Sequence, residues 1–160
     1  MRLRAIELRA ENSPLRKRAE SILGQLINAL AGPEEIDQLD TRLIEKLSLA
    51  GELRPGYLLR ALEQKRLGLF TKALARLGGY QAEAVSRAIA SSDRPELLAL
   101  ALAGIGIDRG AFQTILEKVR AISGGAPGGG DEGVRRAMGA FAQVSAPVAA
   151  EAFRRASEAV

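Results

Sequence analysis

The chain has 160 residues, the size of one ordinary domain, and 47% of them are hydrophobic although only 4% are aromatic. It contains no Cys and no His, which excludes disulfides, thiolate nucleophiles, Cys- or His-based metal sites and Ser-His triads. The formal net charge of +4 lies entirely in residues 1–18, where six basic side chains stand against two acidic ones. A basic face over the whole body, as a nucleic-acid-binding domain needs, is therefore not implied.

The apolar residues are mainly Leu and Ala, which favour helices, whereas strands favour β-branched and aromatic side chains. Three- and four-residue spacing of apolar side chains, with Pro and Gly as boundaries, predicts about nine short helices and no strand. The fold class is therefore all-α, either a stack of short helical hairpins resembling a HEAT-like α-solenoid or an irregular helical bundle. In chain order the helices are expected at 14–30, 33–50, 55–62, 69–77, 80–90, 95–103 and 109–122, around 134–141, and from 147 through 153.

Several helix ends carry recognisable signals. Glu34 and Glu35 stand where the positive end of a helix dipole attracts carboxylates, and Asp108 is expected to cap the helix that follows it. Residues 91–93, Ser-Ser-Asp, offer caps for the helix that contains 97–103. Because 97–103 is apolar on nearly every side, that helix is expected to be central.

Residues 124–130 contain five Gly and one Pro, a composition that predicts a flexible loop. A phosphate-binding loop would need a preceding strand and a Lys-Ser/Thr pair after the last Gly, but Asp131 and Glu132 follow here. We therefore expect a single helical domain over 1–160, with a flexible loop at 124–130 and a C-terminal helical pair at 131–160.

An internal repeat offers a test between the two architectures. Leu58 and Leu97 occupy matching positions 39 residues apart, and Phe70 and Phe112 match at a spacing of 42. Helix-pair repeats of HEAT type have a period of about 40 residues. Chance similarity among Leu-rich helices is the alternative explanation, and either reading places Phe70 and Phe112 in the core.

A longer pattern points to a family. Leu58-Leu59-Arg60-Ala61-Leu62 is followed by Leu69-Phe70, by 73–79, by Val85, by 97–106 and by Phe112 with Ile115-Leu116. This pattern resembles the alphaproteobacterial domain-of-unknown-function family 2336, most closely over residues 50–123. The resemblance implies a helical-repeat protein and transfers no catalytic residue. Members are often longer at the N-terminus, which implies either a short member or a fragment of a longer protein.

Two basic groups are the candidate contacts. Arg16, Lys17 and Arg18, with Arg2, Arg4 and Arg9, could contact an anionic partner, either nucleic acid or an anionic membrane surface, but a solvated helix face is the favoured explanation. A second group, predicted as the contact for an acidic partner, consists of Arg60, Lys65, Arg66 and Arg76.

Other polar residues have simpler explanations. Glu34, Glu35, Asp37 and Asp40 could bind a metal ion, but dipole compensation accounts for them. Tyr57 and Tyr80 are expected to pack with exposed hydroxyls. No catalytic residue, metal ligand or cofactor is predicted.

We therefore expect a non-enzymatic helical protein–protein interaction module in a bacterial cytoplasm, with an unidentified protein partner, a regulatory or signalling role and a tendency to form homodimers. The alternative is a nucleic-acid-associated regulator that uses the basic N-terminal segment. An enzyme working through carboxylates alone is a third hypothesis. No stretch approaches the roughly 20 apolar residues that span a bilayer.

Overall fold

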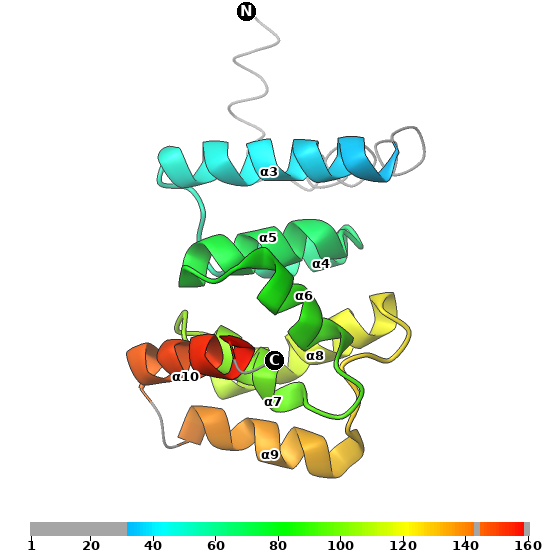
Figure 1. Ribbon diagram of the computed structural model, residues 1–160, viewed down its shortest axis with the longest axis vertical. Helices are drawn as coiled ribbons and strands as arrows, with labels where there is room; N and C mark the ends of the chain where they lie inside the picture. The colour runs from blue at the N-terminus through cyan, green and yellow to red at the C-terminus, as the bar shows by residue number, and fades with distance from the viewer. Residues whose placement is uncertain (1–31, 143–144, 159–160) are drawn as a thin grey trace, which may run out of the picture. The chain divides into compact units, whose positions relative to one another are not determined.

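The computed structural model describes residues 32–142 and 145–158 (Figure 1), and all regular secondary structure in these ranges is helical. This confirms the all-α prediction. The helices are α3 (Pro33–Leu49), α4 (Tyr57–Glu63), α5 (Leu67–Gly78), α6 (Ala82–Ala90), α7 (Pro95–Ala103), α8 (Arg109–Ile122), α9 (Gly130–Ala142) and α10 (Ala146–Glu158). The helix expected at 14–30 lies outside the described residues.

The chain divides into two compact units, residues 1–39 and 40–160. The boundary falls inside α3, between Leu39 and Asp40. In the first unit only residues 32–39 are described, and Glu34 and Glu35 stand in the first turn of α3 as predicted. The buried core lies within the second unit.

Of two helix caps predicted from the sequence, the structure confirms one. The Asp108 carboxylate accepts a hydrogen bond from the Ala111 backbone N–H at 2.7 Å, which confirms the predicted cap of α8. The predicted cap of α7 is wrong, because the N-cap residue is Arg94, whose side chain does not cap. Ser91 instead accepts a hydrogen bond from the Arg94 backbone N–H at 3.0 Å and so stabilises the turn before the helix.

Helix α7 lies at the centre of the second unit, as its apolar sequence predicts. It packs against α5, α6, α9 and α10, and Leu98, Ala99, Ala101 and Leu102 are fully buried (Figure 1). Phe70 of α5 and Phe112 of α8 also belong to this core, which confirms their predicted positions. Within the described ranges no helix is long and apolar enough to cross a membrane.

The two halves of the suggested repeat pack differently. Helix α4 packs against α5, but α7 packs against α9 and α10 while α8 packs against α4 and α9. In a solenoid each repeat contacts only its neighbours. Here α7 also contacts α9 and α10, which come two and three helices later in the chain. Of the two predicted architectures, this packing fits the irregular helical bundle. HEAT-like stacking is not confirmed.

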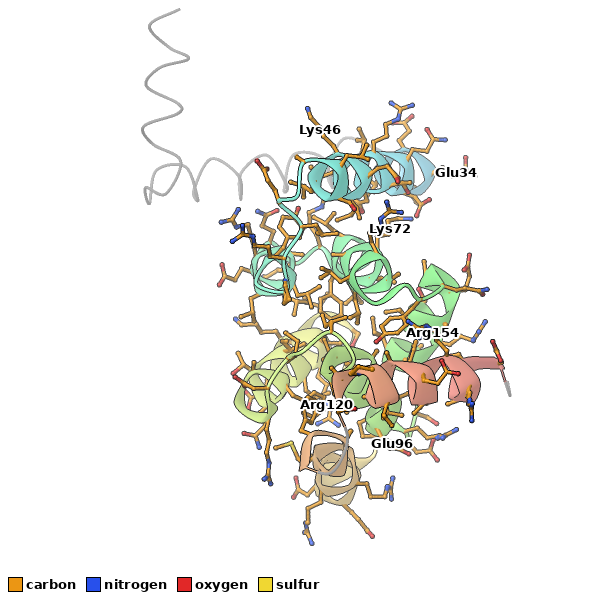
Figure 2. All side chains as sticks on the ribbon, turned by 90° about the vertical axis from the view of Figure 1, so that its left-hand side faces the viewer. Glu34, Lys46, Lys72, Glu96, Arg120 and Arg154 are labelled. Atoms are coloured by element: carbon orange, nitrogen blue, oxygen red, sulfur yellow. The ribbon has the colours of Figure 1, made fainter. Side chains whose placement is uncertain are left out.

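The glycine-rich loop, for which composition predicts flexibility, is hydrogen-bonded to α8 and to the turn before α7. Arg120 of α8 donates hydrogen bonds from Nε to the Pro127 carbonyl at 2.7 Å and from Nη2 to the Gly128 carbonyl at 3.2 Å (Figure 2). The Gly128 N–H bonds the Ser91 carbonyl at 2.9 Å. A Cβ at Gly128 would collide with the Ser92 carbonyl oxygen, so glycine here permits close packing on the α6–α7 turn.

Candidate functional site

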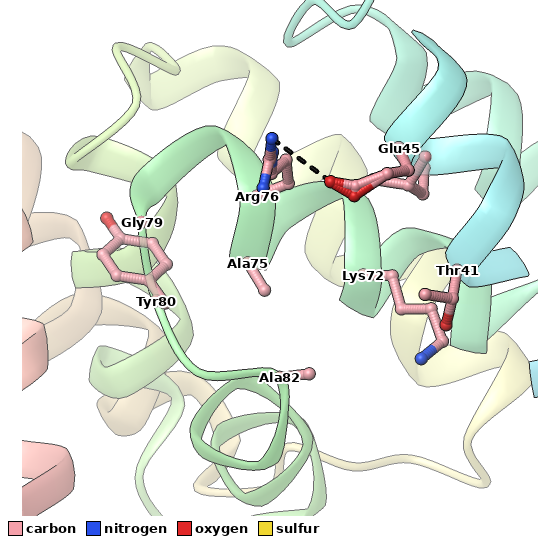
Figure 3. Close-up of a pocket in the computed structure, with 9 residues that line it drawn as sticks. Thr41, Glu45, Lys72, Ala75, Arg76, Gly79, Tyr80 and Ala82 are labelled. Atoms are coloured by element: carbon pink, nitrogen blue, oxygen red, sulfur yellow. Dashed lines mark ion pairs between the residues drawn. The ribbon is translucent and has the colours of Figure 1, made fainter. Parts of the chain in front are cut away.

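A hollow of about 470 Å³ opens between the C-terminal part of α3, α5 and the start of α6 (Figure 3). Thr41, Ile44 and Glu45 of α3 form one wall, and Lys72, Ala75 and Arg76 of α5 form the other. Gly79 and Tyr80, in the turn between α5 and α6, close one end. Lys72 and Arg76 are four residues apart, so one helical turn brings both cations to the same side of α5.

Two further hollows continue along α6. One, of about 210 Å³, shares Gly79 and Tyr80 with the first and reaches Phe153, Arg154 and Ser157 of α10. The next, of about 310 Å³, shares Ala84, Arg87 and Ser157 with the second and ends at the turn before α7. We call the three hollows together the α6 groove. The three hollows adjoin in series, because Gly79 and Tyr80 separate the first from the second, and Ala84, Arg87 and Ser157 line both the second and the third.

The lining of the α6 groove is basic. Five basic side chains stand against two acidic ones, Glu45 and Glu158. Five alanines, Ala75, Ala82, Ala84, Ala88 and Ala156, also line the groove, and Ala75, Ala84 and Ala88 are buried. The basic side chains are Lys72, Arg76, Arg87, Arg94 and Arg154.

Most of these cations have contacts within the protein. Arg76 pairs with Glu45 at 3.4 Å (Figure 3), and its Nε donates to the Ser48 hydroxyl at 3.1 Å. Arg94 pairs with Glu96 at 3.5 Å. Arg87 differs, because it is exposed and makes no hydrogen bond or ion pair within the described ranges. It lines both the second and the third hollow, so it stands at the middle of the path.

Tyr80 fixes the wall between the first two hollows. Its hydroxyl donates a hydrogen bond to the Ala101 carbonyl of α7 at 2.9 Å, and its ring packs on Phe153 with centroids 4.6 Å apart. The hydroxyl is thus buried, which corrects the expectation that it is exposed. Burial raises the pKa of Tyr80 to about 12, although the nearby Arg154 guanidinium opposes the shift.

Arg154 ties α10 to the same wall. Its guanidinium lies 5.6 Å from the centroid of the Tyr80 ring, and Nη2 donates to the Gly78 carbonyl at 2.8 Å, so it reaches from α10 to the end of α5 (Figure 2). Its Nη1 also pairs with Glu151 at 3.5 Å. The groove wall is therefore fixed by contacts among α5, α7 and α10.

The predicted basic group of Arg60, Lys65, Arg66 and Arg76 is only partly exposed. Arg60, Lys65 and Arg76 are exposed, but the Arg66 side chain is 6% exposed and forms a buried ion pair with Asp40. Arg66 therefore cannot offer its guanidinium to a partner, which corrects its place in that group. Of the four, Arg76 lines the α6 groove.

The other candidate residues named from the sequence do not line the α6 groove in the described part of the chain. Arg16, Lys17 and Arg18 lie outside the described residues. Asp40, one of the carboxylates that could have bound a metal ion, is committed to Arg66. In the described ranges no three Asp or Glu residues lie close enough together to hold a metal ion.

Sequence reasoning missed most of the groove. The four-residue spacing of Lys72 and Arg76 was a usable signal, since it places both on one helical face. Arg87 and Arg154 come from separate helices, and no local pattern links residues 67 positions apart. Only the packing of α10 beside α6 and the end of α5 brings them to one hollow.

Comparison with known proteins identifies a family and no characterised relative. Neither the curated proteins nor the solved structures gave a match to this chain. The model of one bacterial family matches residues 3–158, which is nearly the whole sequence. The chain therefore belongs to DUF2336, a family described as an uncharacterised protein conserved in bacteria.

Proposed function

We propose that this protein is a non-enzymatic helical interaction module that binds a segment of a partner protein in the α6 groove. The observation that carries the proposal is the row of three adjoining hollows, each of which shares lining residues with the next. A path of this kind suits an elongated ligand better than a compact one. A regulatory or signalling role would follow from the identity of the partner.

The chemistry of the lining supports binding over catalysis. Side chains that commonly transfer protons near neutral pH are His and suitably placed carboxylates, and the sequence has no His. In the groove, Glu45 is paired with Arg76. Arginine and lysine side chains on a floor of small apolar residues are suited to holding an anionic surface.

A paired capture experiment tests the proposal. Wild-type protein, Arg87→Glu and the control Arg135→Glu are immobilised and exposed to a lysate of the source bacterium. Arg135 is exposed on α9 and lies outside the groove, so the control makes the same change of charge elsewhere. We expect at least one protein retained by the wild type and the control and lost with Arg87→Glu.

Two results would overturn the proposal. One is an identical set of retained proteins for all three samples. The other is retention of nucleic acid alone, which would support the alternative of a regulator acting through the basic residues 1–18. Light scattering coupled to size exclusion on the same samples tests the expected dimer.

A further inference from the structure

The charge of the α6 groove restricts its ligand. The second hollow is lined by Arg87, Arg154 and the exposed Glu158, and the third by Arg87 and Arg94. Arg94 and Arg154 each have a carboxylate partner, Glu96 and Glu151, whereas Arg87 has none in the described part of the chain. The Arg87 guanidinium is therefore the cation of these two hollows whose charge an added carboxylate can neutralise without displacing a partner.

We propose that the ligand of the α6 groove is an acidic peptide segment, with one carboxylate bound by Arg87. This inference rests on the proposed function and adds the chemistry of the partner. The planar guanidinium of Arg87 can bind a carboxylate through two parallel hydrogen bonds. Ser157, which lines the same two hollows, and Arg154 border this position.

The size of the path fits a short stretch of peptide. Helix α6 has nine residues, so it is about 14 Å long at 1.5 Å per residue. An extended peptide advances about 3.3 Å per residue, so about four residues lie along α6. At one end of the segment the first hollow is lined by Lys72 and by the ion pair of Arg76 with Glu45.

A peptide fits the groove better than nucleic acid does. Single-stranded nucleic acid is held by aromatic side chains on which bases stack. The aromatic residues of the groove are Tyr80 and Phe153, which are buried and packed on each other. The formal charge of residues 19–160 is also zero, so the positive groove is a local feature on a neutral body.

Fluorescence polarisation with the full chain tests the inference. The probes are a labelled peptide of alternating Glu and Ala, the same peptide with Gln in place of Glu, and a single-stranded DNA oligonucleotide. We expect the Glu peptide to bind, the Gln peptide not to bind, and affinity for the Glu peptide to fall with added salt. Arg87→Glu should weaken binding about tenfold or more, while Arg135→Glu leaves it unchanged.

Four outcomes would overturn the inference. Equal binding of the Gln peptide would show that charge is not recognised. If Arg87→Glu binds the Glu peptide as tightly as the wild type does, the peptide contacts other cations, such as those of residues 1–18. DNA binding that is as tight as that of the Glu peptide and equally lost with Arg87→Glu would indicate a general polyanion site. If capture of a protein still depends on Arg87 while the Glu peptide fails to bind, the proposed function stands and the acidic ligand is wrong.

Discussion

The Tyr80 hydroxyl and the Ala101 carbonyl form a buried hydrogen bond of 2.9 Å that joins the turn after α5 to the last turn of α7. Because α7 is the central helix, this bond fixes the groove wall to the core. Tyr80→Phe keeps the ring against Phe153 but leaves the Ala101 carbonyl without this donor. We expect a loss of about 1–2 kcal/mol in the free energy of unfolding, measured by urea denaturation. An unchanged midpoint and slope would show that the bond contributes nothing.

The raised pKa of Tyr80 predicts a sensitivity to alkaline pH. The phenol has a pKa of about 12 in the folded protein and an ordinary value of 10.0, so the folded state retains the proton where the unfolded chain loses it. This contribution to stability is complete below pH 10 and is lost as the pH rises toward 12. Urea titrations at pH 9, 10 and 11 should show stability falling above pH 10. With Tyr80→Phe the fall should be smaller, and equal slopes in the two proteins would contradict the prediction.

Gly104 and Gly139 form a matched pair of substitutions. A Cβ at Gly104 would collide with the Tyr80 hydroxyl and stand 2.8 Å from the Ala150 Cα, so Gly104→Ala must displace α10. We expect it to cost about 1–3 kcal/mol of stability. Gly139, inside α9, has open space around its Cβ position, so Gly139→Ala should stabilise by about 0.5–1 kcal/mol. Thermal denaturation measures the change in melting temperature of each variant. Changes of the same sign in the two variants would refute the steric explanation.

The buried ion pair between Asp40 and Arg66 should behave as a unit. The two side chains are 3% and 6% exposed, so removing one leaves an uncompensated charge in the interior. Asp40→Leu or Arg66→Met alone should cost about 3–5 kcal/mol, whereas the double variant should lose less than either single one. Chemical denaturation of all four proteins gives the coupling energy. Additive losses would mean that the pair contributes little beyond its packing.

Arg120 is predicted to hold the glycine-rich loop. Arg120→Ala removes the donors to the Pro127 and Gly128 carbonyls, so amide hydrogen exchange over 124–130 should speed up. A loss of about 1–3 kcal/mol in local protection is expected from bonds made by a charged donor. Lys118→Ala on the same helix serves as the control. Equal exchange in the two variants would show that the loop is held by other contacts.

Local features of the sequence were enough to place the starts of α3, α7 and α8. Pro33, Pro95 and the Asp108 cap mark where α3, α7 and α8 begin, and the uniform apolarity of 97–103 is sufficient to place that helix at the centre. These signals act within one or two helical turns. Capping, proline geometry and burial of an apolar stripe are all determined by near neighbours along the chain.

Contacts between residues far apart in the chain could not be predicted from local sequence patterns. Arg66 looks like one member of an exposed basic cluster, and its burial depends on Asp40, which stands 26 residues earlier on another helix. Composition predicts flexibility for 124–130, yet Arg120 supplies the donors that hold that loop. The α6 groove needs α3, α5, α6 and α10 together, so neither spacing nor charge in one segment could reveal it.

The central position of α7 limits how this fold can change in evolution. A solenoid can lengthen or shorten by duplicating or deleting a repeat at its end, because each unit touches only its neighbours. Here Leu98, Ala99 and Leu102 lie in a helix that α5, α6, α9 and α10 all contact, so loss of α9 or α10 would open the core. Insertions are best tolerated in exposed turns such as that around Gly106, and diversity within the family should concentrate there.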